Sequence, residues 1–109
     1  MHYLVIGHDH PGAEAKQRRA AAREEHLVHL GAAGAARAVF GAAVLDEAGE
    51  MAGSMLVLEA EDQAAVQAWL DEEPYVAQDV WGEVSVQPCR VPPVFLPTDG
   101  SAQGSVPQA

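Results

Sequence analysis

The chain has 109 residues, of which 49% are hydrophobic, and its formal net charge is −10. This length predicts one domain with a core of modest size. The acidic excess disfavours contact with a phosphate backbone, and the sequence has no apolar run long enough to cross a bilayer, so we expect neither a nucleic-acid partner nor a membrane span. The single cysteine, Cys89, cannot form an internal disulfide, which suits a cytoplasmic location.

The N-terminal third of the chain is expected to form a strand followed by a helix. Residues 2–8 contain the apolar run Tyr-Leu-Val-Ile, which is typical of a strand. We interpret Asp9 as the N-cap of the helix that follows, with Pro11 in its first turn. Residues 13–33 contain no proline and are rich in Ala, Arg, Glu and Leu, which favours a helix over this stretch.

The middle of the chain predicts a hairpin and a second helix. Residues 38–45 and 51–59 are strand-like segments on either side of a turn sequence, Asp-Glu-Ala-Gly-Glu. Residues 61–71 follow as a helix, which cannot continue regularly through Pro74. The apolar stripe expected to be buried on this helix consists of Ala65, Val66, Trp69 and Leu70.

The remaining segments complete an α+β pattern. Residues 75–80 suggest one short helical turn, and residues 82–90 alternate like a strand. The order β-α-β-β-α-β predicts a ferredoxin-like fold, with two helices on one face of a four-stranded antiparallel sheet. From residue 96 onward the composition shifts to Pro, Gly, Ser and Gln, so we expect a domain over residues 1–95 and a flexible tail over 96–109.

Two helices cover only one face of such a sheet. The Val and Leu residues of the predicted strands suggest that the other face is partly apolar. An identical sheet from a second copy would cover it, so we expect a symmetric homodimer.

Residues with acid–base chemistry gather on the first helix and at the end of the second. Arg19, Arg23 and His26 recur at spacings of three and four, so they lie on or beside one helix face. Glu73 stands at the proline break, where it could meet them. An imidazole beside a carboxylate is a good general acid or base, and guanidinium groups can hold an anion. The same residues also fit a structural interpretation, with a histidine bonded to backbone, paired arginines and a solvated acidic run at 71–73.

Other candidate residues add less. Ser54 and Tyr75 offer hydroxyls near the expected pocket, but no nucleophile motif surrounds either of them. His26 and His29 are three residues apart and could share a metal ion, but no zinc-type spacing of Cys and His follows. The sequence also has no phosphate loop and no dinucleotide fingerprint. We therefore expect no metal and no other cofactor.

The helix motif resembles a known family. Arg19, Arg23, His26, Leu27 and Leu30 form R-x-x-x-R-x-x-H-L-x-x-L, which is similar to the signature of the YciI-like (YCII-related) proteins. The resemblance extends over roughly residues 1–95. Further matches, in the family's order, are Asp9 with Pro11-Gly12, Gly41, Gly53-Ser54, Trp69, Pro74-Tyr75, Val84, Val86 and Pro88.

This resemblance implies a ferredoxin-like fold that dimerises as an α+β barrel. It also implies an active site built on a His–Asp pair, in a pocket between the sheet and the helices. The family histidine matches His26, but the position of the aspartate holds Glu73 in this chain. Glutamate keeps the charge and moves the carboxylate outward by about 1.5 Å, the length of one carbon–carbon bond.

We therefore predict a small cofactor-independent enzyme. His26 would act as general acid or base, oriented by Glu73 or Asp9. Arg19 and Arg23 would hold a small anionic or enolisable molecule, with Asp9, Ser54 and Tyr75 also lining the substrate site. The reaction would be of the lyase, isomerase or dehalogenase type. The alternative is a non-catalytic module that binds a ligand or serves as a dimeric accessory protein.

Overall fold

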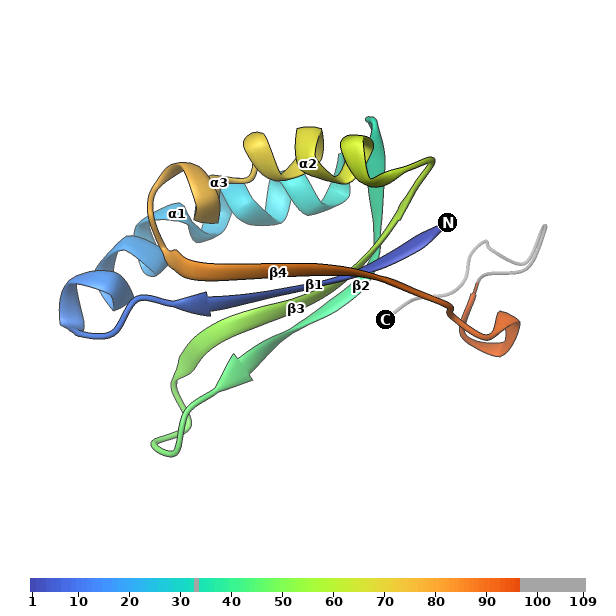
Figure 1. The fold of residues 1–109 in the computed structure, drawn as a ribbon. Coiled ribbons are helices and arrows are strands. Elements are labelled where there is room, and N and C mark those ends of the chain that lie inside the picture. The colour runs from blue at the N-terminus through green and yellow to red at the C-terminus, as the bar shows by residue number, and fades with distance from the viewer. Residues whose placement is uncertain (33, 97–109) are drawn as a thin grey trace.

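The structure is a computed structural model that describes residues 1–32 and 34–96 of the chain. Its elements follow the predicted order, including the short helix before the last strand, and a 3₁₀ helix, η1, is added after that strand (Figure 1). The elements are β1 (His2–Asp9), α1 (Ala13–Gly31), β2 (Ala36–Leu45), β3 (Met51–Ala60), α2 (Gln63–Asp71), α3 (Pro74–Ala77), β4 (Trp81–Cys89) and η1 (Pro93–Phe95).

The four strands form one antiparallel sheet in the order β2-β3-β1-β4. All three α-helices lie on the same face of this sheet (Figure 1). The predicted α+β class and the ferredoxin-like arrangement are therefore confirmed. None of the described helices is both long and apolar enough to cross a membrane.

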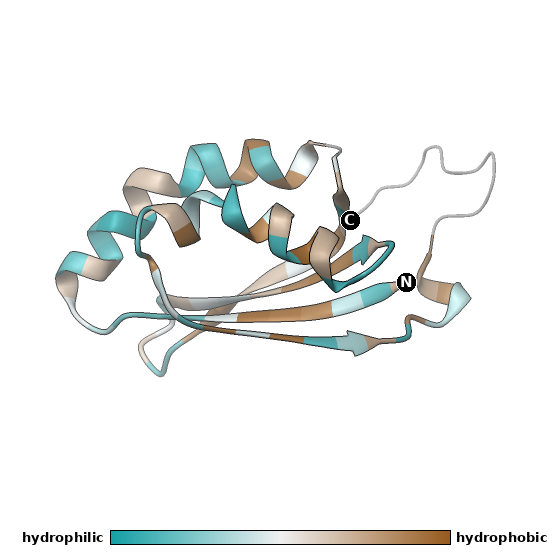
Figure 2. Ribbon diagram, turned by 45° about the horizontal axis from the view of Figure 1, so that its top comes forward, coloured by the Kyte–Doolittle hydropathy of each residue, from teal (hydrophilic) through white to brown (hydrophobic). Residues whose placement is uncertain are grey.

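The core lies between the sheet and the helices. Alternate residues of the strands point to this side, because successive side chains of a strand face opposite directions. Figure 2 shows the hydrophobic residues concentrated on the strands, while α1 carries many hydrophilic residues. On α2, three of the four predicted stripe residues are buried and the fourth, Ala65, is partly buried. The largest core side chains include Tyr3, Val5, Leu56, Leu58, Val66, Trp69, Leu70, Tyr75 and Trp81.

The other face of the sheet carries an apolar stripe. Val57 lies between Leu56 and Leu58 of β3, both of which face the helices, so its side chain points to the opposite face. Its register partners there are Leu4 of β1 and Phe40 of β2. Phe40 remains 44% exposed in the single chain. Val57 is only 5% exposed, so Phe40 is the most accessible member of this stripe. The stripe lies on the face for which we predicted a second copy.

The predicted cap of the first helix is wrong. Asp9 is the last residue of β1, and α1 begins at Ala13 with Gly12 at the N-cap and no side-chain cap. Gly12 has φ 101°, a conformation that glycine adopts without the strain that a Cβ would cause. The carboxylate of Asp9 binds Arg19 instead, since an ion pair with a buried guanidinium is stronger than a cap hydrogen bond.

The buried face of α1 also differs from expectation. It consists of Ala15, Arg19, Ala22 and His26, so that two alanines and two polar side chains face the interior. Leu27, the residue after His26 in the family motif, is 49% exposed. The helix ends at Gly31, earlier than the predicted end at residue 33. Alanine lets α1 approach closely, and the two polar groups are tolerated because each has a partner.

Other boundaries shift slightly. β2 begins two residues earlier than predicted, and the expected turn over residues 75–80 is the short helix α3, which begins at Pro74. The flexible tail expected over 96–109 lies, apart from Leu96, outside the described residues.

Candidate active site

The structure buries the side chains of Arg19, His26, Ser54 and Glu73, and all four were predicted as site residues. Arg19 and His26 come from α1, Ser54 from β3, and Glu73 directly precedes α3. Buried polar groups are costly unless they are hydrogen-bonded, so their gathering at one place marks the centre of the candidate site.

His26 and Glu73 form the closest pair of this site. The distance from Nδ1 of His26 to Oε1 of Glu73 is 2.5 Å, the imidazole side chain is 8% exposed and the glutamate side chain is fully buried. The same Oε1 accepts a hydrogen bond from the backbone N–H of Tyr75 at 3.1 Å. An oxygen that accepts this bond is suited to accept a second one from Nδ1–H, which leaves Nε2 of His26 as the nitrogen that can exchange a proton.

The start of α3 positions this carboxylate. Glu73 is the N-cap of α3, and Pro74 follows at the first helical position, where its fixed φ suits a helix start. Glu73, which stands where the resemblance implies an aspartate, therefore still contacts the imidazole. The longer side chain reaches His26 while it also caps the helix.

Two aromatic residues enclose the imidazole of His26. The ring of Tyr75 stacks on it with the centroids 3.9 Å apart and the planes 13° apart, and Trp81 approaches edge-on at 6.4 Å. Burial raises the pKa of the Tyr75 phenol, so this group stays neutral near pH 7. Tyr75 thus covers one face of the His26 ring, and Trp81 packs against that ring nearly at a right angle.

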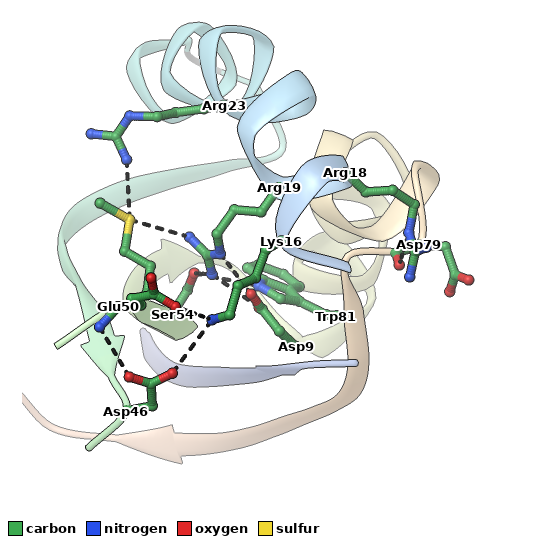
Figure 3. Close-up of polar contacts among 11 residues, drawn as sticks. Asp9, Lys16, Arg18, Arg19, Arg23, Asp46, Glu50, Ser54, Asp79 and Trp81 are labelled. Carbon is green, nitrogen blue, oxygen red and sulfur yellow. Dashed lines mark hydrogen bonds and ion pairs between the residues drawn. The ribbon is translucent and has the colours of Figure 1, made fainter. Parts of the chain in front are cut away.

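Arg19 lies on the other side of this cluster and is bound by Asp9. Its Nε and Nη2 donate to the two carboxylate oxygens of Asp9 at 2.7 and 3.0 Å, and Nη2 also donates to Oγ of Ser54 at 2.9 Å (Figure 3). Burial by itself would lower the pKa of Arg19, but the hydrogen bond and the charge of Asp9 outweigh it and raise that pKa. The positive charge of Arg19 is therefore largely compensated within the chain.

Trp81 also belongs to this cluster, although it was not among the predicted site residues. Its Nε1–H donates to Oγ of Ser54 at 3.3 Å, and its indole lies directly over Gly7 of β1. A Cβ at Gly7 would come within 2.4 Å of the indole ring, so no larger residue fits there without a shift of the tryptophan. A glycine inside an otherwise apolar strand often marks such a close approach, and this was the signal available in the sequence.

Arg23 differs from Arg19 in its surroundings. It is exposed, its Nη1 lies 3.4 Å from the sulfur of Met51, and it forms no ion pair with the residues that the structure describes. Earlier on α1, Lys16 reaches Asp46 at 3.4 Å and Glu50 at 3.3 Å in the β2–β3 turn. Lys16, Arg19 and Arg23 therefore form a row of cations along the side of α1 that faces the β2–β3 hairpin (Figure 3).

A shallow hollow of about 250 Å³ lies where β1 ends beside the start of β4. Its lining includes His8, His10 and Asp9, but His10 Nε2 is already in contact with Oδ1 of Asp79 at 2.9 Å. Within residues 1–32 and 34–96, no three His, Cys, Asp or Glu side chains come together as a metal-binding group.

Comparisons with known proteins agree with this fold. The family model of the YCII-related domain matches residues 1–90. Among solved structures, the chain is similar to 5-chloro-2-hydroxyhydroquinone dehydrochlorinase (TftG) from Burkholderia phenoliruptrix AC1100, determined in complex with 2,5-dihydroxybenzoquinone. The TM-score is 0.71 and the identity 24%, with 83% of this chain and 94% of that chain covered. No curated protein matches the chain. Since the family model covers most of its length, the chain belongs to the YCII-related family.

Proposed function

We propose that this protein is a small-molecule enzyme in which His26 transfers a proton and Glu73 orients it. The observation that carries the proposal is the buried contact of 2.5 Å between Nδ1 of His26 and Oε1 of Glu73. A carboxylate at this position fixes the tautomer of the ring and stabilises the imidazolium that forms when Nε2 takes a proton. A positioned acid or base of this kind contributes about 10²–10⁴-fold to a rate.

The reaction we propose is the transfer of a proton from an enolisable or phenolic molecule to Nε2 of His26. In an elimination, the bond to the leaving group then breaks and that group departs as an anion with the bonding electron pair. In an isomerisation, the imidazolium returns the proton to another atom of the same molecule. This reaction needs a base, a carboxylate that orients the base, and a group that binds the negative charge of the substrate. It needs no cofactor. The similar structure belongs to an enzyme whose name denotes the removal of hydrogen chloride, and it contains a dihydroxybenzoquinone. That molecule is small and acidic, which fits the substrate class that we infer from the site.

Arg23 is the better of the two arginines to hold such an anion. Arg19 is bound by Asp9 and Ser54, so its role in the proposal is to fix these two groups beside the substrate. Arg23 is exposed one turn further along α1. Asp9 and Ser54 complete the proposed lining of the substrate site, whereas the structure buries Tyr75, which was also predicted there, against His26 and Arg19.

The test is a thermal-shift titration with 2,5-dihydroxybenzoquinone. We expect the Tm of the wild type to rise with the logarithm of ligand concentration, since binding to the native state alone stabilises it. His26→Ala should lose most of this rise, measured against its own unliganded Tm. His8→Ala is the matched control, because His8 is an exposed histidine on β1, and it should respond like the wild type. An equal response of His26→Ala and wild type would overturn the proposed site.

A non-catalytic ligand-binding or accessory module is the second candidate. It is favoured by the contacts of Arg19, Asp9 and Ser54, which satisfy one another within the chain and could serve stability alone. Ligand binding that depends on His26, with no chemical conversion of any bound compound, would support this candidate over the enzyme.

We also propose that the protein forms a homodimer through the apolar stripe on the uncovered sheet face. Light scattering at micromolar concentration should give twice the 11.5 kDa mass of one chain. Phe40→Glu should yield a monomer, because a carboxylate cannot be buried between two apolar sheets without a partner. Phe95→Glu is the control, since Phe95 is exposed in η1, outside the sheet, and should leave the dimer intact. A monomeric wild type would contradict the proposal.

A further inference from the structure

We infer that Tyr75 is a positioning residue for His26, acting through its ring and its backbone amide and not through its hydroxyl. This inference rests on the proposed function and deepens it, since it names what holds the proposed proton-transfer group in place.

The ring of Tyr75 lies between two side chains of α1. The imidazole of His26 stacks on it at 3.9 Å, and Cζ of Arg19 lies over it at 4.6 Å. One face of the ring offers little room for both groups at these distances, which favours an arrangement with one group on each face. Arg19 and His26 are seven residues apart, about 10.5 Å along the helix axis, which leaves room for one aromatic ring between them. Tyr75 fills that space.

The backbone of Tyr75 acts on the partner of His26. Its N–H donates to Oε1 of Glu73 at 3.1 Å, and this oxygen is the one that contacts Nδ1 of the imidazole. One residue therefore fixes both members of the pair. The ring of Tyr75 fixes the plane of the imidazole, and its backbone amide fixes the position of the Glu73 oxygen that contacts Nδ1 of the imidazole.

The far face of the Tyr75 ring is fixed as well. Arg19 is held by Asp9 and Ser54, and Ser54 also accepts a hydrogen bond from Trp81. The stack thus extends from Asp9 through Arg19 and Tyr75 to His26, and each member contacts the next. An electron-rich ring face also favours positive charge on the group stacked against it, which helps the imidazole when Nε2 takes a proton.

The hydroxyl of Tyr75 has no part in this arrangement. It is buried and has no hydrogen-bond partner among the described residues. Phenylalanine would keep the ring and the amide, whereas leucine would keep only the amide. Tyr75→Phe and Tyr75→Leu therefore separate the two proposed contributions from the hydroxyl.

The experiment is NMR of the unliganded full chain. The Nδ1–H proton of His26, in a short bond to a carboxylate, should give a far-downfield signal, and Glu73→Ala should remove it. We expect Tyr75→Phe to keep this signal with its wild-type exchange rate. Tyr75→Leu should raise the rate at which this proton exchanges with water about tenfold, because the variant loses the stabilisation that one stacked ring pair provides. An unchanged exchange rate in Tyr75→Leu, or loss of the signal in Tyr75→Phe, would overturn the inference.

If Tyr75→Leu does not fold, pentafluorophenylalanine at position 75 replaces it. This residue keeps the shape of the ring but reverses the charge on its face, so it should also accelerate exchange relative to phenylalanine, and equal exchange would count against the inference. The measurement uses no ligand. An equal thermal shift of His26→Ala and wild type would therefore refute the proposed ligand site, and a failed NMR test would refute only the positioning role of Tyr75.

Discussion

Replacing Arg19 by methionine should destabilise the folded protein by about 3–5 kcal/mol, the range found when one partner of a buried ion pair is removed. The side chains of Arg19 and Asp9 are each only 7% exposed, so the variant leaves the carboxylate of Asp9 buried without its counter-ion. Methionine forms helices as well as arginine does, so helix propensity does not contribute. Domains of this size are stable by about 5–15 kcal/mol, and the loss should therefore be a large fraction of the total.

Urea unfolding followed by circular dichroism measures this loss. Arg23→Met is the matched control, since it makes the same change one turn later on the exposed side of α1 and should stay within about 0.5 kcal/mol of the wild type. The double variant Asp9→Asn with Arg19→Met removes both charges and should recover part of the stability. Equal stability of Arg19→Met and Arg23→Met would show that the pair with Asp9 contributes nothing.

This contrast between two arginines illustrates what the sequence could predict. The spacing of Arg19, Arg23 and His26 placed them on or beside one face of a helix, and that is where they lie. This spacing could not predict which arginine is buried. A helical pattern gives the direction of each side chain around the helix axis, but not how closely the sheet or another helix approaches it. That distance depends on tertiary contacts, such as those with α3, which packs against α1 from more than forty residues away, and with Ser54 of β3, which binds Arg19.

The fold itself was largely predictable because its signals are local. Strand alternation, the proline at position 74 and the turn between β2 and β3 each act over a few residues, and together they fix the order of the elements. The errors arose where a long-range contact outweighed a local preference. Asp9 is a residue type that often caps helices, but its carboxylate binds the buried guanidinium of Arg19, ten residues later in the sequence.

Trp81 shows the same limit at the site. Its sequence neighbourhood marks only the start of a strand. Its contact with Ser54 and its position over Gly7 depend on the pairing of β4 with β1 and on the neighbouring β3, which no local pattern contains. The candidate pair was easier to predict, because the helix break at Pro74 and the resemblance to the YCII-related family both pointed to Glu73.

Replacing Glu73 by glutamine should separate activity from stability. The carboxylate is fully buried, and its Oε2 has no hydrogen-bond partner among the described residues. Such a group is costly to bury, whereas the glutamine carbonyl can still accept hydrogen bonds from Nδ1–H of His26 and the N–H of Tyr75. We therefore expect Glu73→Gln to be within about 1 kcal/mol of the wild type, or more stable. Its turnover should fall by about 10²–10⁴-fold, because a neutral amide does not stabilise the imidazolium.

Glu73→Ala is the comparison that makes this result decisive. It leaves Nδ1–H of His26 and the N–H of Tyr75 without an acceptor, at about 1–3 kcal/mol each, and the second of these bonds is also the N-cap hydrogen bond of α3. Urea unfolding gives the stabilities, and the turnover of any compound that the wild type converts gives the activities. If Glu73→Gln destabilises the protein as much as Glu73→Ala does, the negative charge of Glu73 stabilises the folded protein and Glu73 is a structural residue. If Glu73→Gln keeps the stability of the wild type but loses the turnover, the buried charge of Glu73 contributes to proton transfer and not to folding. Residues selected for function often carry such a cost in stability.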